Sequence, residues 1–421
     1  MAPSAHLIFD DTAGRVATRV TKMRPSAVRN LFAAATRDDI ISLSGGMPDV
    51  SLLPASAVKK ATRAALEESR PQALQYGSTD GRVETRAVLC GLMRDIGVRV
   101  KPDDLLLTSG AQEALALLAE TFINPGDIII TEGPTYLGAL QAFSAYEPDV
   151  HCVPFDEDGM RMDLLEEELV RIGKGNPHLK FLYTIPNFQN PGGVTMSPER
   201  RRRLIELANE YDFLILEDDP YGRLRYDGGH VLPLRALSDK VVYLGTVSKV
   251  FAPGLRLGWI VAPAGVLAKI NLVKQGADLC GSTFNQIVVE HYFTDTPWQR
   301  TLQKFVSTYK TRRDAMLAAL ERYFPPEVTW THPEGGFFVW VTLPSYMDTN
   351  SLLADALEAG VTFVPGDGFY PDGKRGRNCM RIAFCYESPE NLDEAIRRLA
   401  EVIEDQLELY RAFLTAGAIA E

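Results

Sequence analysis

The residue with the clearest chemical potential in this 421-residue chain is Lys249, which follows the apolar stretch VVYLGTVS. A lysine that is desolvated at a strand end has a lowered pKa, and its amine is then a better nucleophile for forming a Schiff base. A solvated lysine is the ordinary alternative, but the neighbours of Lys249 favour chemistry. Ser248 precedes it, and Arg256 lies beyond Pro253–Gly254, where the chain can turn back. A hydroxyl and a guanidinium close to the lysine suit a phosphate group.

Residues that could bind a phosphate or a nitrogen-containing aromatic ring also follow other apolar stretches. Backbone N–H groups at 110–112, where a helix is predicted to begin, offer an anion site. Asp218, after FLILE, could hold a pyridinium nitrogen protonated and make that ring an electron sink, or it could merely cap a turn. Asn190 and Tyr221 could donate hydrogen bonds to a phenolate oxygen on the same ring, and Tyr136 could stack on its face. The structural alternatives are a turn at Asn190 and core positions for the tyrosines.

The elements that must position these residues are strands of one sheet. Between about residues 100 and 265, short apolar runs such as LLLTSG, FLYTIPN and FLILEDD alternate with helix-like stretches. Apolar strands interleaved with helices indicate a mostly parallel sheet covered on both faces. Open sheets of this type bind ligands beyond the carboxyl ends of their strands. We therefore predict an α/β fold whose seven-stranded sheet brings SGAQ, PNFQNPGG, DDPY and SK to one crevice.

The character of the chain changes after residue 265. A helical stretch at about 284–322, interrupted at Asp295–Pro297, precedes EVTWTHPEGGFFVWVTLP, which favours antiparallel strands. Further strands and an amphipathic helix close the chain. The pattern predicts a large domain over residues 56–310 and a smaller α+β domain made of residues 1–55 and 311–421.

Composition limits the possible partners. The chain has 44 Lys and Arg against 55 Asp and Glu, a net charge of −11, which disfavours nucleic acid and anionic membranes as partners. It has no apolar stretch near the roughly 20 residues that span a bilayer, and no pattern typical of a signal peptide. The five cysteines include no CxxC pair, which favours a reducing cytoplasm, and the six histidines form no metal-binding pattern, so no metal is expected.

Taken in order, the motifs SGAQ, PTY, PNFQNPGG, EDDPY, SKVFAPGLRLGW and CMRIAF span most of the chain. This ordered set resembles the fold-type I aminotransferases of class I/II, which depend on pyridoxal 5′-phosphate (PLP). SLSGGMPD (42–49), ALQYGSTDG (73–81), KQGADL (274–279) and PSAVR (25–29) are most similar to the 2-aminoadipate and kynurenine aminotransferase branch.

The resemblance implies a role for each matched residue. Lys249 would form the Schiff base with PLP, Asp218 would pair with the pyridine nitrogen, and Tyr136 would stack on the ring. Asn190 and Tyr221 would contact the phenolate oxygen. The residues implied around the phosphate are Gly110, Ala111, Gln112, Ser248, Arg256 and, from the partner subunit, Tyr76. Those implied around the substrate are Arg381 at the α-carboxylate, Gly46 and Asn190 nearby, and Arg29 at the side chain.

The reaction implied by the resemblance is a transamination. The α-amino group of a 2-aminoadipate, aromatic or branched-chain amino acid would pass to a 2-oxo acid such as 2-oxoglutarate by a ping-pong mechanism, in a cytoplasmic homodimer with shared active sites. Lys249 would remove the Cα proton. Two alternatives stay open: another PLP-dependent reaction (lyase, decarboxylase or oxidase), and a ligand-sensing module of a regulator. The latter is disfavoured because only about 40 residues, without a helix-turn-helix pattern, precede SLSGG.

Overall fold

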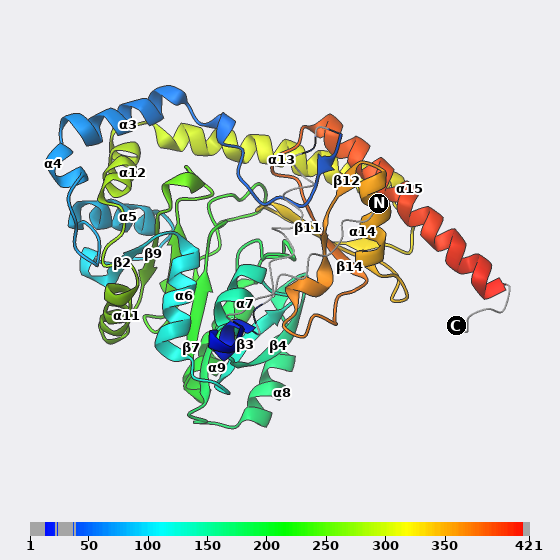
Figure 1. Ribbon diagram of the computed structural model, residues 1–421, viewed down its shortest axis with the longest axis horizontal. Coiled ribbons are helices and arrows are strands. Elements are labelled where there is room, and N and C mark those ends of the chain that lie inside the picture. Colours follow the sequence, from blue (N-terminus) through cyan, green and yellow to red (C-terminus); the bar gives the residue numbers. More distant parts are fainter. Residues whose placement is uncertain (1–12, 22, 24–36, 38, 416–421) are drawn as a thin grey trace.

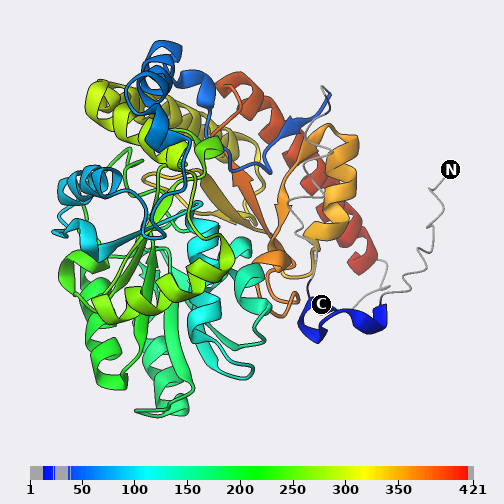
Figure 2. The ribbon, with the colours of Figure 1, turned by 60° about the vertical axis from the view of Figure 1, so that its left-hand side comes forward.

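The computed structural model describes residues 13–21, 23, 37 and 39–415. A body containing the large sheet (cyan to green) lies beside a C-terminal part (orange to red) (Figures 1 and 2). Arg29 and the other residues of PSAVR lie outside the described residues.

The large sheet has eight strands in the order β2-β9-β8-β7-β6-β3-β4-β5. Its strands are β2 (Leu105–Thr108), β3 (Ile128–Gly133), β4 (Asp149–Asp156), β5 (Gly159–Met160), β6 (Leu179–Thr184), β7 (Leu214–Asp218), β8 (Val242–Thr246) and β9 (Gly258–Val261). The pairs from β4 through β8 are parallel, whereas β9 runs antiparallel to both neighbours. The mostly parallel α/β sheet is thus confirmed. It has one strand more than predicted, because the two-residue β5 forms a hairpin with β4.

Adjacent residues of the central strands enter cores on opposite faces of this sheet. Ile129 and Phe181 belong to one hydrophobic core, and their neighbours Ile130 and Leu182 belong to another. Successive side chains of a strand point to opposite faces, so a strand buried on both faces must be apolar throughout. The first core includes residues of α3 (Ala55–Glu67), α4 (Arg70–Ala73), α5 (Val83–Asp95), α6 (Ala111–Phe122), α7 (Leu137–Ser144), α11 (Ala264–Ala277) and α12 (Thr283–Asp295). The second includes residues of α8 (Met162–Ile172), α9 (Pro198–Tyr211) and α10 (Leu234–Leu237).

The C-terminal part has its own core around a four-stranded antiparallel sheet of order β10-β11-β14-β13. Its strands are β10 (Thr329–Trp330), β11 (Phe338–Thr342), β13 (Val364–Pro365) and β14 (Cys379–Ala383), and its helices are α14 (Thr349–Glu358) and α15 (Pro389–Thr415). β1 (Ile41–Ser42) pairs in parallel with β12 (Val361–Thr362), which places the segment before Gly46 against this part. The domain boundaries at 55/56 and 310/311 stay a prediction.

Helix α13 (Trp298–Tyr323) passes from the large body into the C-terminal part. Its Phe305 and Tyr309 lie in the first core, and its Met316 and Leu320 lie in the C-terminal core. The predicted interruption of the long helical stretch is confirmed, since α12 ends at Asp295 and α13 begins at Trp298.

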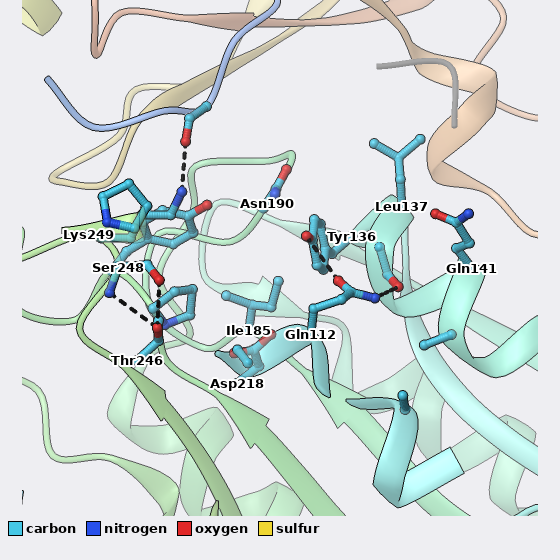
Figure 3. A pocket seen from close by; sticks show the side chains of 18 of the residues that line it. Gln112, Tyr136, Leu137, Gln141, Ile185, Asn190, Asp218, Thr246, Ser248 and Lys249 are labelled. Atoms are coloured by element: carbon cyan, nitrogen blue, oxygen red, sulfur yellow. Dashed lines mark hydrogen bonds between the residues drawn. The ribbon is translucent and has the colours of Figure 1, made fainter. Parts of the chain in front are cut away.

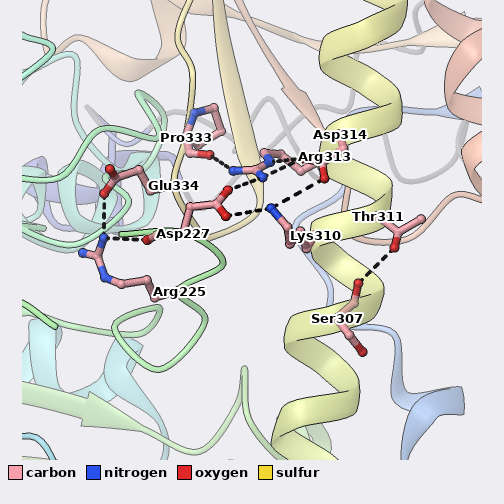
Figure 4. Close-up of polar contacts among 9 residues, drawn as sticks. All are labelled: Arg225, Asp227, Ser307, Lys310, Thr311, Arg313, Asp314, Pro333 and Glu334. Carbon is pink, nitrogen blue, oxygen red and sulfur yellow. Dashed lines mark hydrogen bonds and ion pairs between the residues drawn. The ribbon is translucent and has the colours of Figure 1, made fainter. Parts of the chain in front are cut away.

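A cluster of ion pairs holds α13 at this crossing (Figure 4). Lys310 Nζ lies 2.7 Å from a carboxylate oxygen of Asp227, which also pairs with Arg313. Arg225 Nη1 lies 2.6 Å from Glu334 Oε2, in the turn before β11. The loop after β7, the helix and this turn are therefore joined where the two parts of the molecule meet.

Candidate active site

A cavity of about 740 Å³ lies where the predicted strand ends converge. Figure 3 shows Lys249 towards one end, Leu137 and Gln141 towards the other, and Asp218, Asn190, Gln112 and Tyr136 between them. The predicted residues that line it are Gly46, Ala111, Gln112, Tyr136, Asn190, Asp218, Tyr221, Ser248, Lys249, Arg256 and Arg381. Gly110 adjoins it, whereas Tyr76, with 79% of its surface exposed, does not line the cavity of this single chain.

Lys249 lies just beyond β8 and extends into the cavity. Its Nζ donates a 2.7 Å hydrogen bond to the carbonyl oxygen of Gly46, and it lies 5.5 Å from the centre of the Phe337 ring. Burial lowers the pKa of Lys249 to about 8. The neutral, nucleophilic form of this amine is therefore far more populated near neutral pH than that of an ordinary lysine.

Asp218 ends β7 and is buried at the floor of the cavity. The Tyr183 hydroxyl donates a 2.8 Å hydrogen bond to its Oδ2, whereas the buried Oδ1 has no hydrogen-bond partner among the described residues. Burial raises the pKa of Asp218 to about 7. A buried acceptor without a partner is costly, and a protonated ring nitrogen in the cavity would supply both the hydrogen bond and the positive charge that it lacks.

The start of α6 and the turn at Arg256 form a site suited to a phosphate. Gly110, with a φ of +84°, precedes α6 and leaves the N–H groups of Ala111 and Gln112 outside the helical hydrogen-bond ladder. Arg256 Nη2 donates a 3.0 Å hydrogen bond to the carbonyl oxygen of Ser109. A Cβ at Gly110 would lie 2.4 Å from Arg256 Nη2, so only glycine permits this approach. Thr246 and Ser248 also line the cavity, and the Thr246 hydroxyl donates a 2.9 Å hydrogen bond to the Ser248 hydroxyl.

Arg381 extends from β14 and is buried, with 3% of its surface exposed. Its Nη1 donates a 3.0 Å hydrogen bond to Asn190 Oδ1, and its Nη2 donates a 2.9 Å bond to the carbonyl oxygen of Ser44. Burial lowers the pKa of Arg381 to about 10, and its Nε has no hydrogen-bond partner among the described residues. The planar guanidinium is thus held in place with donor capacity left for a carboxylate.

Sequence reasoning missed two residues at this site. Phe338 is the first: the guanidinium carbon of Arg381 lies 4.1 Å from the centre of the Phe338 ring. Phe338 follows EGGF, a pattern that indicates only a turn. Buried Gln189 fastens the loops that carry Tyr136 and Asn190, because its Nε2 donates to Glu132 Oε2 at 3.1 Å and to the carbonyl oxygen of Pro134 at 2.9 Å. The only signal was its place beside Asn190 in PNFQNPGG.

The residues at the strand ends lie in the α/β fold that the sequence predicts, and comparison with known proteins supports the same family. The chain belongs to the aminotransferase class I and II family, whose model matches residues 38–399. It is a PLP-dependent aminotransferase, and it falls in the branch that includes aromatic, 2-aminoadipate and kynurenine aminotransferases.

Three relatives illustrate the similarity. Aromatic-amino-acid aminotransferase 1 of Thermococcus litoralis is 46% identical over 91% of this chain and 93% of its own. The kynurenine aminotransferase structure of Pyrococcus horikoshii is 42% identical, with a TM-score of 0.90 over 94% of this chain and 99% of that one. The α-aminoadipate aminotransferase of Thermus thermophilus, solved with N-(5′-phosphopyridoxyl)-L-leucine, is 35% identical, with a TM-score of 0.86 over the same shares.

Two features are absent from the described residues. Over residues 13–21, 23, 37 and 39–415, no group of three or more His, Cys, Asp or Glu side chains is placed to hold a metal ion. Within the same part of the chain, no helix is long and apolar enough to cross a membrane.

Proposed function

We propose that this aminotransferase transfers the α-amino group of an amino acid with a large uncharged side chain, aromatic above all, to a 2-oxo acid such as 2-oxoglutarate. The observation that carries the proposal is the cavity that Lys249, Asp218 and Arg381 share, with no other charged side chain except Arg256 among the described residues that line it. We further propose a ping-pong mechanism in a cytoplasmic homodimer.

The residues of the cavity are suited to hold PLP. The unpartnered Oδ1 of Asp218 would accept the ring N–H, and the N–H groups of Ala111 and Gln112, with Gly110, Ser248 and Arg256, would bind the phosphate. Asn190 and Tyr221 would contact the phenolate oxygen, and Tyr136 would lie against the ring. When bound, PLP supplies an electron sink for the charge that develops at Cα of the substrate.

Arg381 and Lys249 would act on the substrate itself. Arg381 would bind the α-carboxylate through two parallel hydrogen bonds, with Gly46 and Asn190 beside it, and so fix Cα near the lysine. The Lys249 amine, with its lowered pKa, would take the proton from Cα and return one later in the turnover.

The rest of the cavity supports an uncharged side chain. Outside the residues assigned to PLP and to the α-carboxylate, the described lining includes apolar, amide and phenol side chains: Met23, Ala116, Leu137, Gln141, Ala142, Ala145 and Tyr146. Each charged residue that lines the cavity already has a proposed partner, so none of them is left for a distal carboxylate. The aromatic specificity in the name of the 46% identical relative agrees with this. Arg29, the predicted specificity residue, lies outside the described residues.

A panel of amino donors with 2-oxoglutarate, compared by kcat/KM, tests the substrate class. We expect phenylalanine and tyrosine to exceed glutamate and 2-aminoadipate by about tenfold or more, since one unpaired buried charge costs several kcal/mol. Higher values for the acidic donors would overturn the proposal. In that case Arg29→Ala should weaken the acidic donors more than phenylalanine, whereas an equal loss on all donors would remove Arg29 from specificity.

A single-turnover measurement tests the reaction type. Without a 2-oxo acid, a transaminase releases one equivalent of oxo acid per site and stops, because the cofactor keeps the amino group. Addition of 2-oxoglutarate should restart the reaction. A lyase, decarboxylase or oxidase would turn over continuously with the amino acid alone.

The proposed dimer is supported by an exposed apolar surface near Tyr76. Leu74, Tyr76 and Leu279 are 70%, 79% and 56% exposed, and the Thr79 hydroxyl binds the carbonyl oxygen of Leu279 at 2.8 Å, so the two segments are adjacent. Light scattering after gel filtration should give twice the mass of one chain. Tyr76→Phe should weaken PLP binding if Tyr76 reaches the phosphate of the partner subunit.

A further inference from the structure

Lys274 is fully buried on α11 and has no part in the reaction described above. It begins the KQGADL segment. Its ammonium group pairs with the carboxylate of Asp278 and lies 3.9 Å from Glu113 Oε1. Burying a lysine is costly unless it is paired, so an ordinary surface lysine would not be placed here.

Glu113 connects Lys274 to the proposed phosphate site. It lies in the first turn of α6, and its Oε2 accepts a hydrogen bond from the backbone N–H of Ser109. The carbonyl oxygen of the same residue, Ser109, accepts the 3.0 Å hydrogen bond from Arg256 Nη2. A continuous series of contacts therefore runs from Lys274 through Glu113 and Ser109 to Arg256.

Glu113 places a negative charge beside the proposed phosphate site. A carboxylate in the first turn of α6 interacts favourably with the helix dipole, but it opposes a second anion at the same N–H groups. Burial raises the pKa of Glu113, and the nearby carboxylate of Asp278 raises it further, whereas the N–H of Ser109 and the ammonium group of Lys274 favour the ionised form of Glu113. Lys274, which does not line the cavity, offsets part of this charge.

We propose that Lys274 and Glu113 are positioning residues for the phosphate of PLP. Glu113 fixes the Ser109–Gly110 turn and, through it, the Arg256 guanidinium. Lys274, which is shared between Asp278 and Glu113, offsets part of the negative charge of Glu113 beside the phosphate site. This inference rests on the proposed placement of the phosphate at residues 110–112 and Arg256.

The test compares the affinity of the cofactor-free protein for PLP and for pyridoxal, which lacks the phosphate, at about pH 8, where the phosphate is ionised. In Lys274→Met we expect PLP to bind about tenfold more weakly, with little change for pyridoxal. Lys274→Met combined with Glu113→Gln should recover most of the loss, because the side chain that contacts the Ser109 turn then carries no charge. Inorganic phosphate, which competes with PLP, should also bind Lys274→Met more weakly than the wild type, and the double variant should recover most of this loss.

Matched variants make each outcome decisive. Lys269→Met, on the exposed face of α11, should leave both affinities unchanged. Arg256→Ala should weaken PLP selectively; if it does not, the placement of the phosphate is wrong. If it does, while Lys274→Met weakens PLP and pyridoxal equally or the double variant recovers nothing, the role of Lys274 and Glu113 is overturned. If Lys274→Met does not fold, the double variant, in which residue 113 carries no charge, decides the question. A ratio of PLP affinity to pyridoxal affinity well below that of Lys269→Met then contradicts the proposal.

Discussion

Lys249 donates its hydrogen bond to the carbonyl oxygen of Gly46, which lies 203 residues earlier in the chain. The contact joins the end of β8 in the large sheet to the segment that follows β1 in the C-terminal part. A Cβ on Gly46 would lie 2.8 Å from the Phe338 ring, so glycine lets this segment approach the floor of the cavity. The lysine is thereby held in the cavity, and both parts of the molecule contribute to the site.

Lys249→Ala should abolish transamination, with kcat lowered by about a thousandfold or more, because both the covalent attachment and the proton transfer are lost. Borohydride reduction followed by peptide mass analysis should find the cofactor on the peptide containing residue 249 in the wild type and on no peptide in the variant. Lys240→Ala, an exposed lysine before β8, serves as the control. Labelling of another lysine in the wild type would contradict the assignment.

Asp218→Asn should stabilise the cofactor-free protein at high pH. Folding raises the pKa of Asp218 from 3.8 to about 7. The folded protein therefore keeps a proton that the unfolded chain releases, and ionisation of this carboxyl lowers the free energy of unfolding as the pH rises through that range.

Urea unfolding measures this effect. We expect Asp218→Asn and the wild type to be similar at about pH 5, and the variant to be more stable by roughly 1–3 kcal/mol at about pH 8. Asp212→Asn, at an exposed carboxyl before β7, provides the matched comparison. An equal difference at both pH values would show that Asp218 does not titrate in this range.

Arg381→Lys should raise KM for amino donors by about a hundredfold while lowering kcat less, because lysine keeps the charge but loses the planar fork that binds a carboxylate at two points. Steady-state kinetics with phenylalanine measures the split. Arg377→Lys, on the exposed side before β14, should change neither constant. A loss confined to kcat would exclude Arg381 from ground-state binding of the carboxylate.

Gln189→Ala should lower kcat/KM by about tenfold or more, because the loops that carry Tyr136 and Asn190 lose the hydrogen bonds that join them. The variant should also lose about 1–3 kcal/mol of stability, because the buried Glu132 loses a hydrogen-bond donor. Burial already raises the pKa of Glu132 to about 7. Gln275→Ala, an exposed position on α11, controls for the loss of an amide. Unchanged kinetics in a less stable Gln189→Ala protein would reduce its role to folding alone.

Local pattern in the sequence was enough to predict much of this site. Lys249 and Asp218 follow apolar runs that must be buried strands, and the rule that parallel strands end at one edge of a sheet predicts that they lie close together. The resemblance to a family then supplied Arg381, which lies on a different sheet and follows no such rule.

The contacts made across long distances in the chain were not predictable in the same way. Gln189 and Lys274 are ordinary polar residues in the sequence, and their importance comes only from burial beside Glu132 and Glu113. The two-residue β5 is too short for a periodic pattern, and its hairpin is fixed by pairing with β4.

The strand order has a consequence for how the protein is made. β2, which precedes the proposed phosphate site, is an edge strand of the described sheet and pairs there with β9. Its hydrogen-bond ladder is therefore incomplete until Gly258 is available to pair with Thr108. On the ribosome, β3 to β8 emerge before that partner exists, and contacts so distant in sequence form slowly. The nascent chain should therefore acquire cofactor affinity only after β9 has left the exit tunnel, however early its other strands associate.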